Sequence, residues 1–268
     1  MNLIINKTGN IVASIGRSFI KKLENLFYAA GFFCLLIKET FLIIGKKQLT
    51  GRLFTLQILF TGIDALGIVA VLSLSLGAAI IVQGLALLPM FGQGSLIYSI
   101  LITVITKELG PILVAFIIIA RSSTAIATEL GNMVVSHEIE AYISTGINPV
   151  SYLVVPRFLG VTISLVILNI WFNIFGLFGS YFVTQLFSPI PLDDFFHNLF
   201  IILKPGDIFS SLIKCLVFGI IISSVATYNG FRVERSPTEI PGVVIKSVEQ
   251  GFLLCIIANV IITLMYYT

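Results

Sequence analysis

The sequence predicts an all-α integral membrane protein, in which an N-terminal interfacial helix precedes five transmembrane helices. Of its 268 residues, 57% are hydrophobic and only 11% are charged, and the mean hydropathy is +1.06. A soluble domain carries about 25% charged residues, so this chain cannot cover a water-facing surface of its size. Most of its exterior therefore faces lipid, and a single membrane domain is expected.

The N-terminal part differs from the rest of the chain. Its apolar run Leu26–Ile37 is short and has basic residues on both sides, which is typical of a helix lying in the membrane interface; a sixth span is the alternative. The first residues lack the compact apolar core of a signal peptide. We therefore divide the chain into a cytoplasmic or interfacial segment, residues 1–52, and a transmembrane domain, residues 53–268.

Five segments reach the roughly 20 apolar residues that a membrane-spanning helix needs. They are residues 62–88, 96–120, 153–187, 208–229 and 247–267. The third is too long for one perpendicular helix, which indicates tilt or an extension beyond the bilayer. Small residues at four-residue spacing allow helices to pack closely in lipid. They occur in three pairs: Ser73 with Gly77, Ser75 with Ala79, and Gly176 with Ser180.

The lysines and arginines predict the orientation. Thirteen of the 16 lie before the first span or around the connections that follow the second and fourth spans, whereas only Lys204 and Lys214 lie on the opposite side. This bias places the N-terminus on the cytoplasmic or stromal side. The segment Ser188–Asp207 and the C-terminal Thr268 are then expected on the far side.

Two ionisable residues, Lys107 and Glu108, lie about 11 residues into the second predicted span. At about 1.5 Å per residue this is near mid-membrane, where charges are costly and normally face a cavity or a partner charge. Pro111 follows and removes a backbone donor. A structural ion pair is one interpretation, and polar lining of a cavity that meets a lipid headgroup is the preferred one.

The segment Ala125–Thr145 connects the second and third predicted spans on the inner side. It carries Glu129, Glu138 and Glu140, and its apolar residues recur near helical spacing before a glycine and a proline end it. The pattern predicts an amphipathic helix near residues 129–145 that a soluble partner could bind. A solvated loop is the alternative.

Other site types are not indicated. The three cysteines and two histidines are dispersed, so neither a redox pair nor a metal site nor a bound cofactor is expected. The sequence contains no G-x-x-x-x-G-K-[ST] motif, which would cradle ATP phosphates. We therefore expect no enzymatic activity, and ATP would be bound by a separate subunit.

The most specific pattern lies between Thr106 and Gly160. It reads KELGPILVAFIIIARSSTAIATELGNM from Lys107 and EIEAYISTGINPVSYLVVPRFLG from Glu138. In the order and spacing of its charged, glycine and proline positions it resembles the signature region of the MlaE-type permeases, which work with MCE-domain proteins in bacterial and plastid lipid transport. The resemblance extends over roughly residues 26–268.

This resemblance implies a homodimeric permease subunit of an ABC-type transporter that moves phospholipid or a glycerolipid precursor. A cytoplasmic or stromal ATPase subunit and an MCE-domain lipid-binding protein would be its partners, and no nucleic acid is implied. In the family the helix between the second and third spans couples to the ATPase, so Glu129, Glu138 and Glu140 are the expected coupling residues. Lipid would occupy a cavity in the dimer. The expected binding residues are Lys107, Glu108, Gly77, Gln83, Leu85 and Lys246, with Glu108 balancing Lys107 or Lys246.

The sequence departs from the family pattern at three positions. Lys107 stands where arginine is usual, which keeps the charge but loses the bidentate fork that suits phosphate. Asn259 replaces an aspartate that is frequent in bacterial relatives, and Leu85 replaces a tyrosine found in some of them.

Two other function classes were considered. A secondary transporter or channel is the alternative, but it predicts inverted repeats, and five spans do not divide into equal halves. A membrane-embedded enzyme would need clustered His, Asp or Glu, whereas the charged residues here are dispersed. The 43 isoleucines against 15 alanines are typical of an AT-rich genome such as that of a plastid. The location that the resemblance implies for this multi-pass protein is the chloroplast inner envelope or a bacterial inner membrane.

Overall fold

A computed structural model describes residues 27–43, 51–87, 96–187, 191–234 and 236–267. The chain forms two compact units, Met1–Gln48 and Leu49–Thr268. In the first unit, residues 27–43 form one helix with exposed apolar side chains. The helix agrees with the sequence analysis, and its place in the membrane interface stays a prediction.

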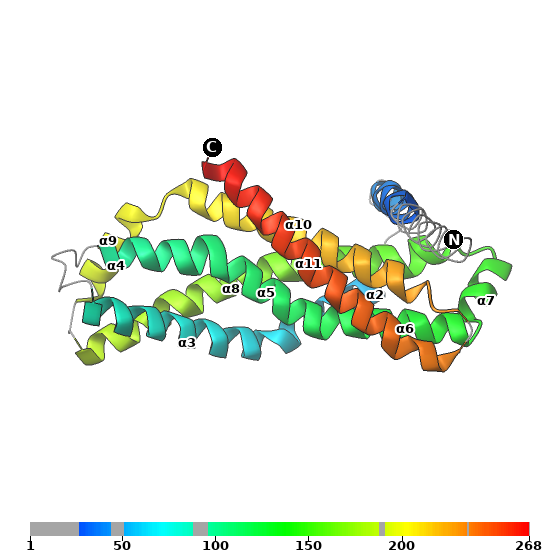
Figure 1. The fold of residues 1–268 in the computed structure, drawn as a ribbon, viewed down its shortest axis with the longest axis horizontal. Coiled ribbons are helices and arrows are strands. Elements are labelled where there is room, and N and C mark those ends of the chain that lie inside the picture. Colours follow the sequence, from blue (N-terminus) through cyan, green and yellow to red (C-terminus); the bar gives the residue numbers. More distant parts are fainter. Residues whose placement is uncertain (1–26, 44–50, 88–95, 188–190, 235, 268) are drawn as a thin grey trace, which may run out of the picture. The chain divides into compact units, whose positions relative to one another are not determined.

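The second unit is a bundle of long helices (Figure 1). The first span comprises α2 (Gly51–Ile58), the π-helical segment η1 (Leu59–Ile63) and α3 (Asp64–Leu87). The second span begins with α4 (Leu96–Leu101), the π-helical segment η3 (Ile102–Leu109) and α5 (Gly110–Ile118). It ends with the π-helical segment η4 (Ile119–Ser123) and α6 (Thr124–Val135). After α7 (Glu138–Ser144), the third span comprises the π-helical η5 (Val150–Val154) and α8 (Val155–Phe187). Next come α9 (Leu192–Ile202), α10 (Pro205–Gly230), the 3-10 helix η6 (Pro237–Glu239) and α11 (Ile240–Tyr267).

Five helical stretches of the described chain are long and apolar enough to cross a membrane: Gly51–Ala86, Leu96–Val135, Val150–Leu186, Pro205–Gly230 and Pro237–Tyr266. The described part of the chain contains no strand. The protein is therefore an all-α integral membrane protein with five spans, as the sequence predicts. α4 and α9 lie at one end of the bundle, and α6 and α7 lie at the other (Figure 1).

The second span is longer than the sequence indicates. Its helix does not end at residue 120 but continues to Val135, so the first half of the expected connection Ala125–Thr145 belongs to the span. No proline lies between Pro111 and Pro149, and the hydroxyl of Thr124 donates to carbonyl oxygens of the preceding turn, which lets a polar side chain stay inside a helix. The separate helix on this side is α7 alone, and its coupling role stays a prediction.

The chain leaves the second span at His137. This residue has a left-handed backbone, with φ 58°, which is uncommon for a residue other than glycine. The turn there ends the second span, and α7 starts directly after it. The rings of Tyr142 in α7 and Tyr152 in η5 pack with their centroids 5.5 Å apart. α7 is therefore connected to both the second and the third spans.

Small residues bring α3 and α8 into close contact, as two of the three predicted pairs indicate. Gly77 is buried, and a Cβ atom added to it would collide with the backbone carbonyl oxygen of Gly176. Ser73 and Ser180 are also fully buried. The third pair, Ser75 with Ala79, is exposed and does not contribute to packing within the chain.

We expect Gly77→Ala to destabilise the protein, because its methyl group meets a backbone atom that cannot rotate away. Overpacking of this kind costs about 1–3 kcal/mol. The matched control is Gly67→Ala on the same helix, where an added Cβ has no neighbour within 4 Å; it should be neutral or slightly stabilising. Thermal unfolding in detergent measures both, and equal melting temperatures would contradict the packing role of Gly77.

Candidate functional site

Lys107 and Glu108 lie in η3, the π-helical part of the second span. The shorter predicted span places them near its middle. In the structure the helix has 40 residues, and they lie nearer to its α4 end. Their ion-pair partners come from the first three turns of α10. The site therefore lies at the end of the bundle where α10 begins.

Two partly buried ion pairs join the second and fourth spans. Lys107 Nζ lies 2.8 Å from Asp207 Oδ1, and Glu108 Oε2 lies 2.9 Å from Lys214 Nζ. The expectation that Glu108 balances Lys107 or Lys246 is therefore wrong. Adjacent helix residues point in different directions, so Lys107 and Glu108 each meet a separate partner. Asp207 and Lys214, seven residues apart, share one face of α10.

The fifth span completes the site with three polar side chains. The hydroxyl of Tyr266 donates to Asp207 Oδ1 at 2.8 Å. The hydroxyl of Thr263 donates to Glu108 at 3.2 Å, and Asn259 Nδ2 donates to the same carboxylate at 3.3 Å. These three residues of α11 follow the spacing i, i+4, i+7, which places them on one face of the helix.

We call this set of seven residues the polar cluster: Lys107, Glu108, Asp207, Lys214, Asn259, Thr263 and Tyr266. It holds two positive and two negative side chains, so its charges balance. Lys214 also donates to the backbone carbonyl oxygen of Lys107 at 2.9 Å, and the ammonium group of Lys107 lies 5.6 Å from the centre of the Tyr266 ring. Such pairing is what an apolar environment requires of buried charges.

The charged members of the cluster differ in exposure. The side chains of Asp207 and Lys214 are 2% and 1% exposed, whereas those of Lys107 and Glu108 are 17% and 29% exposed; Tyr266 of α11 is exposed as well. Of the four charged groups, a molecule at the surface of the cluster can therefore reach the cation and the carboxylate of the second span. Lys107 can donate hydrogen bonds to an anionic group, and Glu108 can accept them from an ammonium or hydroxyl group.

The structure does not gather the remaining expected binding residues at the cluster. Gly77 is buried between α3 and α8, Gln83 is exposed on α3, and Leu85 packs against the core. Lys246 is exposed on α11, 13 residues before Asn259, which corresponds to about 20 Å along the helix. A role for these four residues in binding stays a prediction.

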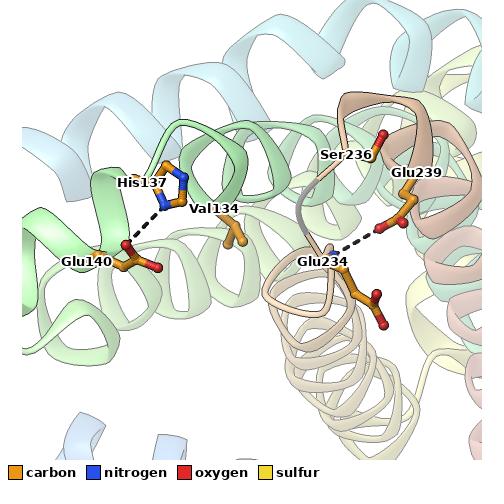
Figure 2. A pocket seen from close by; sticks show the side chains of 6 residues that line it. All are labelled: Val134, His137, Glu140, Glu234, Ser236 and Glu239. Carbon is orange, nitrogen blue, oxygen red and sulfur yellow. Dashed lines mark hydrogen bonds and ion pairs between the residues drawn. The ribbon is translucent and has the colours of Figure 1, made fainter.

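The expected coupling residues lie at the opposite end of the second span. Glu129 is on α6 and pairs with the buried Arg157 at 2.7 Å, while Glu138 and Glu140 begin α7. Next to α7 is a pocket of about 620 Å³ between the α6–α7 turn and the α10–α11 connection (Figure 2). It is lined by Val134, His137, Glu140, Glu234, Ser236 and Glu239. Three of these six residues are acidic.

The sequence of this chain matches the family model of the MlaE permease over residues 54–265, which is most of its length. The chain belongs to the MlaE permease family. Similar proteins include a probable ABC transporter permease of Rickettsia felis, 28% identical over 96% of this chain and 98% of the relative. The chloroplast protein trigalactosyldiacylglycerol 1 of Arabidopsis thaliana is 28% identical over 62% of this chain and 47% of its own length. The MlaE permease of the intermembrane phospholipid transport system of Haemophilus influenzae is 24% identical over 70% of this chain and 74% of its own.

Five residues of the cluster in this MlaE permease are absent from the site expected from the sequence: Asp207, Lys214, Asn259, Thr263 and Tyr266. Asn259 was considered only as a departure from the family pattern. Asp207 and Lys214 counted only as charges on the far side of the membrane. Their spacing of seven residues at the start of an apolar run was the available signal, because it places both on one helix face. Thr263 and Tyr266 are common in membrane helices and carried no signal of their own.

Lys214→Met should strongly destabilise the protein, because it leaves the carboxylate of Glu108 without its buried cation. Removing one partner of a buried pair costs about 3–5 kcal/mol. The double variant Lys214→Met/Glu108→Gln removes both charges and should recover most of this loss. Lys246→Met, which removes an exposed lysine, is the control and should have little effect. Thermal unfolding and the yield of folded protein in detergent measure the series, and a double variant no better than Lys214→Met would contradict the pairing.

Proposed function

We propose that this permease is the membrane subunit of an ABC-type transporter of phospholipid or a related glycerolipid precursor. The polar cluster is the observation that carries the proposal. It offers a cation and a carboxylate, both partly exposed, within a bundle of largely apolar spans. A lipid has the matching chemistry, because its polar headgroup is joined directly to apolar chains.

The surroundings of the cluster support a lipid rather than a small polar substrate. α11, which supplies Asn259, Thr263 and Tyr266, is mostly exposed, with only 11% of its apolar stretch buried. The exposed side chains beside these three residues are large and apolar, among them Val260, Ile261 and Leu264. Acyl chains could lie along this face while the headgroup reaches the cluster. The names of two relatives, one for phospholipid transport and one for a galactolipid, support the same substrate class.

The proposal includes the partners and the assembly. A separate ATPase on the cytoplasmic or stromal side would supply the energy, and an MCE-domain protein on the far side would exchange the lipid. In the described chain, most of the apolar stretch of α11 and much of that of the first span stay exposed. A homodimer would bring two such faces together and enclose a cavity between them, with Lys107 and Glu108 at its wall.

Lipid transport should depend on the two exposed charges of the cluster. We expect Lys107→Met and Glu108→Gln each to reduce the transport rate per assembled complex by at least about tenfold, or ~1.4 kcal/mol. Lys107→Arg, which keeps the charge, should be tolerated better than Lys107→Met. The assay is transfer of labelled phosphatidylglycerol and phosphatidylethanolamine by the complex reconstituted in vesicles.

The control for this assay is Asp64→Asn, which removes a different ion pair, Asp64 with Arg121 at 3.1 Å. It should leave the transport rate close to that of the unchanged protein. Normal rates in both Lys107→Met and Glu108→Gln would show that the cluster serves only folding and would overturn the proposal.

Coupling to the ATPase should depend on α7. This helix has no buried residue, exposes Ile143 and begins with two acidic residues, so a partner can contact most of its surface. We expect Glu138→Lys/Glu140→Lys to weaken ATPase binding by about tenfold or more, or ~1.4 kcal/mol. Copurification and the rate of stimulated ATP hydrolysis measure the effect.

A matched control for α7 is Asp193→Lys/Asp194→Lys, which reverses two exposed acids in the first turn of α9 at the opposite end of the bundle. ATPase binding should be unaffected by this change. If the α7 variant binds and stimulates the ATPase normally, α7 is not the coupling helix.

A further inference from the structure

Asn169 of α8 is a buried polar residue outside the polar cluster. It is 1% exposed, and its Nδ2 donates a hydrogen bond to the hydroxyl of Ser211 in α10 at 2.8 Å. Ser211 is likewise 1% exposed. The bond therefore joins the third and fourth spans in an environment that neither water nor lipid headgroups reach.

The position of Ser211 connects this bond to the cluster. Ser211 follows Asp207 by four residues and precedes Lys214 by three, so all three lie on the same face of α10. A rotation of α10 about its axis would move these three side chains together. The hydrogen bond from Asn169 opposes such a rotation and thereby holds Asp207 and Lys214 toward η3.

The other side of the same amide faces the helix that carries Lys107 and Glu108. A Cβ atom added to Gly110, the residue that follows η3, would lie 3.3 Å from Asn169 Oδ1. This oxygen is buried and has no hydrogen-bond partner. Asn169 thus lies against both helices whose side chains form the two ion pairs.

We propose that Asn169 is a positioning residue, which sets the rotation of α10 against η3 and so the geometry of the two ion pairs. The inference rests on the proposed lipid-transport function. Packing alone does not account for the amide: leucine has a similar size and would fill the same space without leaving a polar atom buried and unpaired. The amide is unfavourable there except for the bond that it makes to Ser211.

The test uses Asn169→Leu and, as a smaller change, Ser211→Ala in the complete complex reconstituted in vesicles. Both remove the bond between α8 and α10 and keep the apolar packing. We expect each to form the complex at normal yield and to transfer labelled phosphatidylglycerol and phosphatidylethanolamine at least about fivefold more slowly. The control is Ser164→Ala. It removes a buried hydroxyl of α8 that makes no hydrogen bond to the described residues, so it should not change the rate.

A second measurement reports on the ion pairs directly. If α10 rotates, the lysine partners of Asp207 and Glu108 move, and with them the charge-assisted hydrogen bonds that these carboxylates accept. Infrared spectra at neutral pH should show a new, shifted carboxylate band in Asn169→Leu and Ser211→Ala that is absent from the unchanged protein and from Ser164→Ala.

The outcomes separate the two proposals. In the first, the unchanged complex transfers lipid, while Asn169→Leu and Ser211→Ala transfer it at the normal rate and show no new band. That result would overturn the positioning role and leave the proposed function intact. No lipid transfer by the unchanged complex would overturn the proposed function, whereas the infrared band would still show whether Asn169 sets the geometry of the pairs. A band that appears in Ser164→Ala as well would also contradict the assignment, because the effect would then follow from the loss of any buried polar group of these spans.

Discussion

The arrangement of the second, fourth and fifth spans depends on one constraint, the pairing of four charges within an apolar layer. An unpaired charge at membrane depth costs about 2.5–3.5 kcal/mol even on a lenient insertion scale. Lys107 and Glu108 are adjacent and point in different directions, so a single partner cannot satisfy both. The register of α10 provides two partners, because Asp207 and Lys214 lie two turns apart on one face. Asp207 pairs with Lys107, and Lys214 pairs with Glu108. The face of α11 then follows, since it supplies hydrogen bonds to both carboxylates.

Local departures from α-helical geometry accompany the charged residues of the first two spans. Lys107 and Glu108 lie in η3, Arg121 lies in η4, and Asp64 directly follows η1. A π-helical turn changes the direction of the following side chains and leaves backbone carbonyl groups less regularly paired. The carbonyl oxygen of Lys107 shows the consequence, since it accepts a hydrogen bond from Lys214. Deviations of this kind at membrane depth are tolerated where other protein groups satisfy the backbone.

The sequence predicts the elements of this protein better than their ends and their partners. Apolar stretches of sufficient length identify all five spans, and small residues identify the contact of α3 with α8. The end of the second span is missed, because hydropathy falls at Arg121 whereas nothing in the chain stops the helix before His137. Lys107 and Glu108 stand out because charges are rare within spans. Their partners Asp207 and Lys214 do not, because a charge near the end of a span is normally read as lying in the loop.

The second span connects the proposed ATPase-binding end of the protein with the polar cluster. Glu108 in the polar cluster and Glu129 near the α7 end belong to one helical stretch that is continuous from Leu96 to Val135. They are 21 positions apart, which corresponds to about 31 Å along the helix. At the α7 end, Glu129 is held by Arg157 of the third span. An ATPase that moves α7 would therefore act directly on the helix that carries Lys107 and Glu108. The fourth span supplies the other half of both ion pairs, so a shift of the second span against it would change the geometry of the polar cluster without any intermediate element.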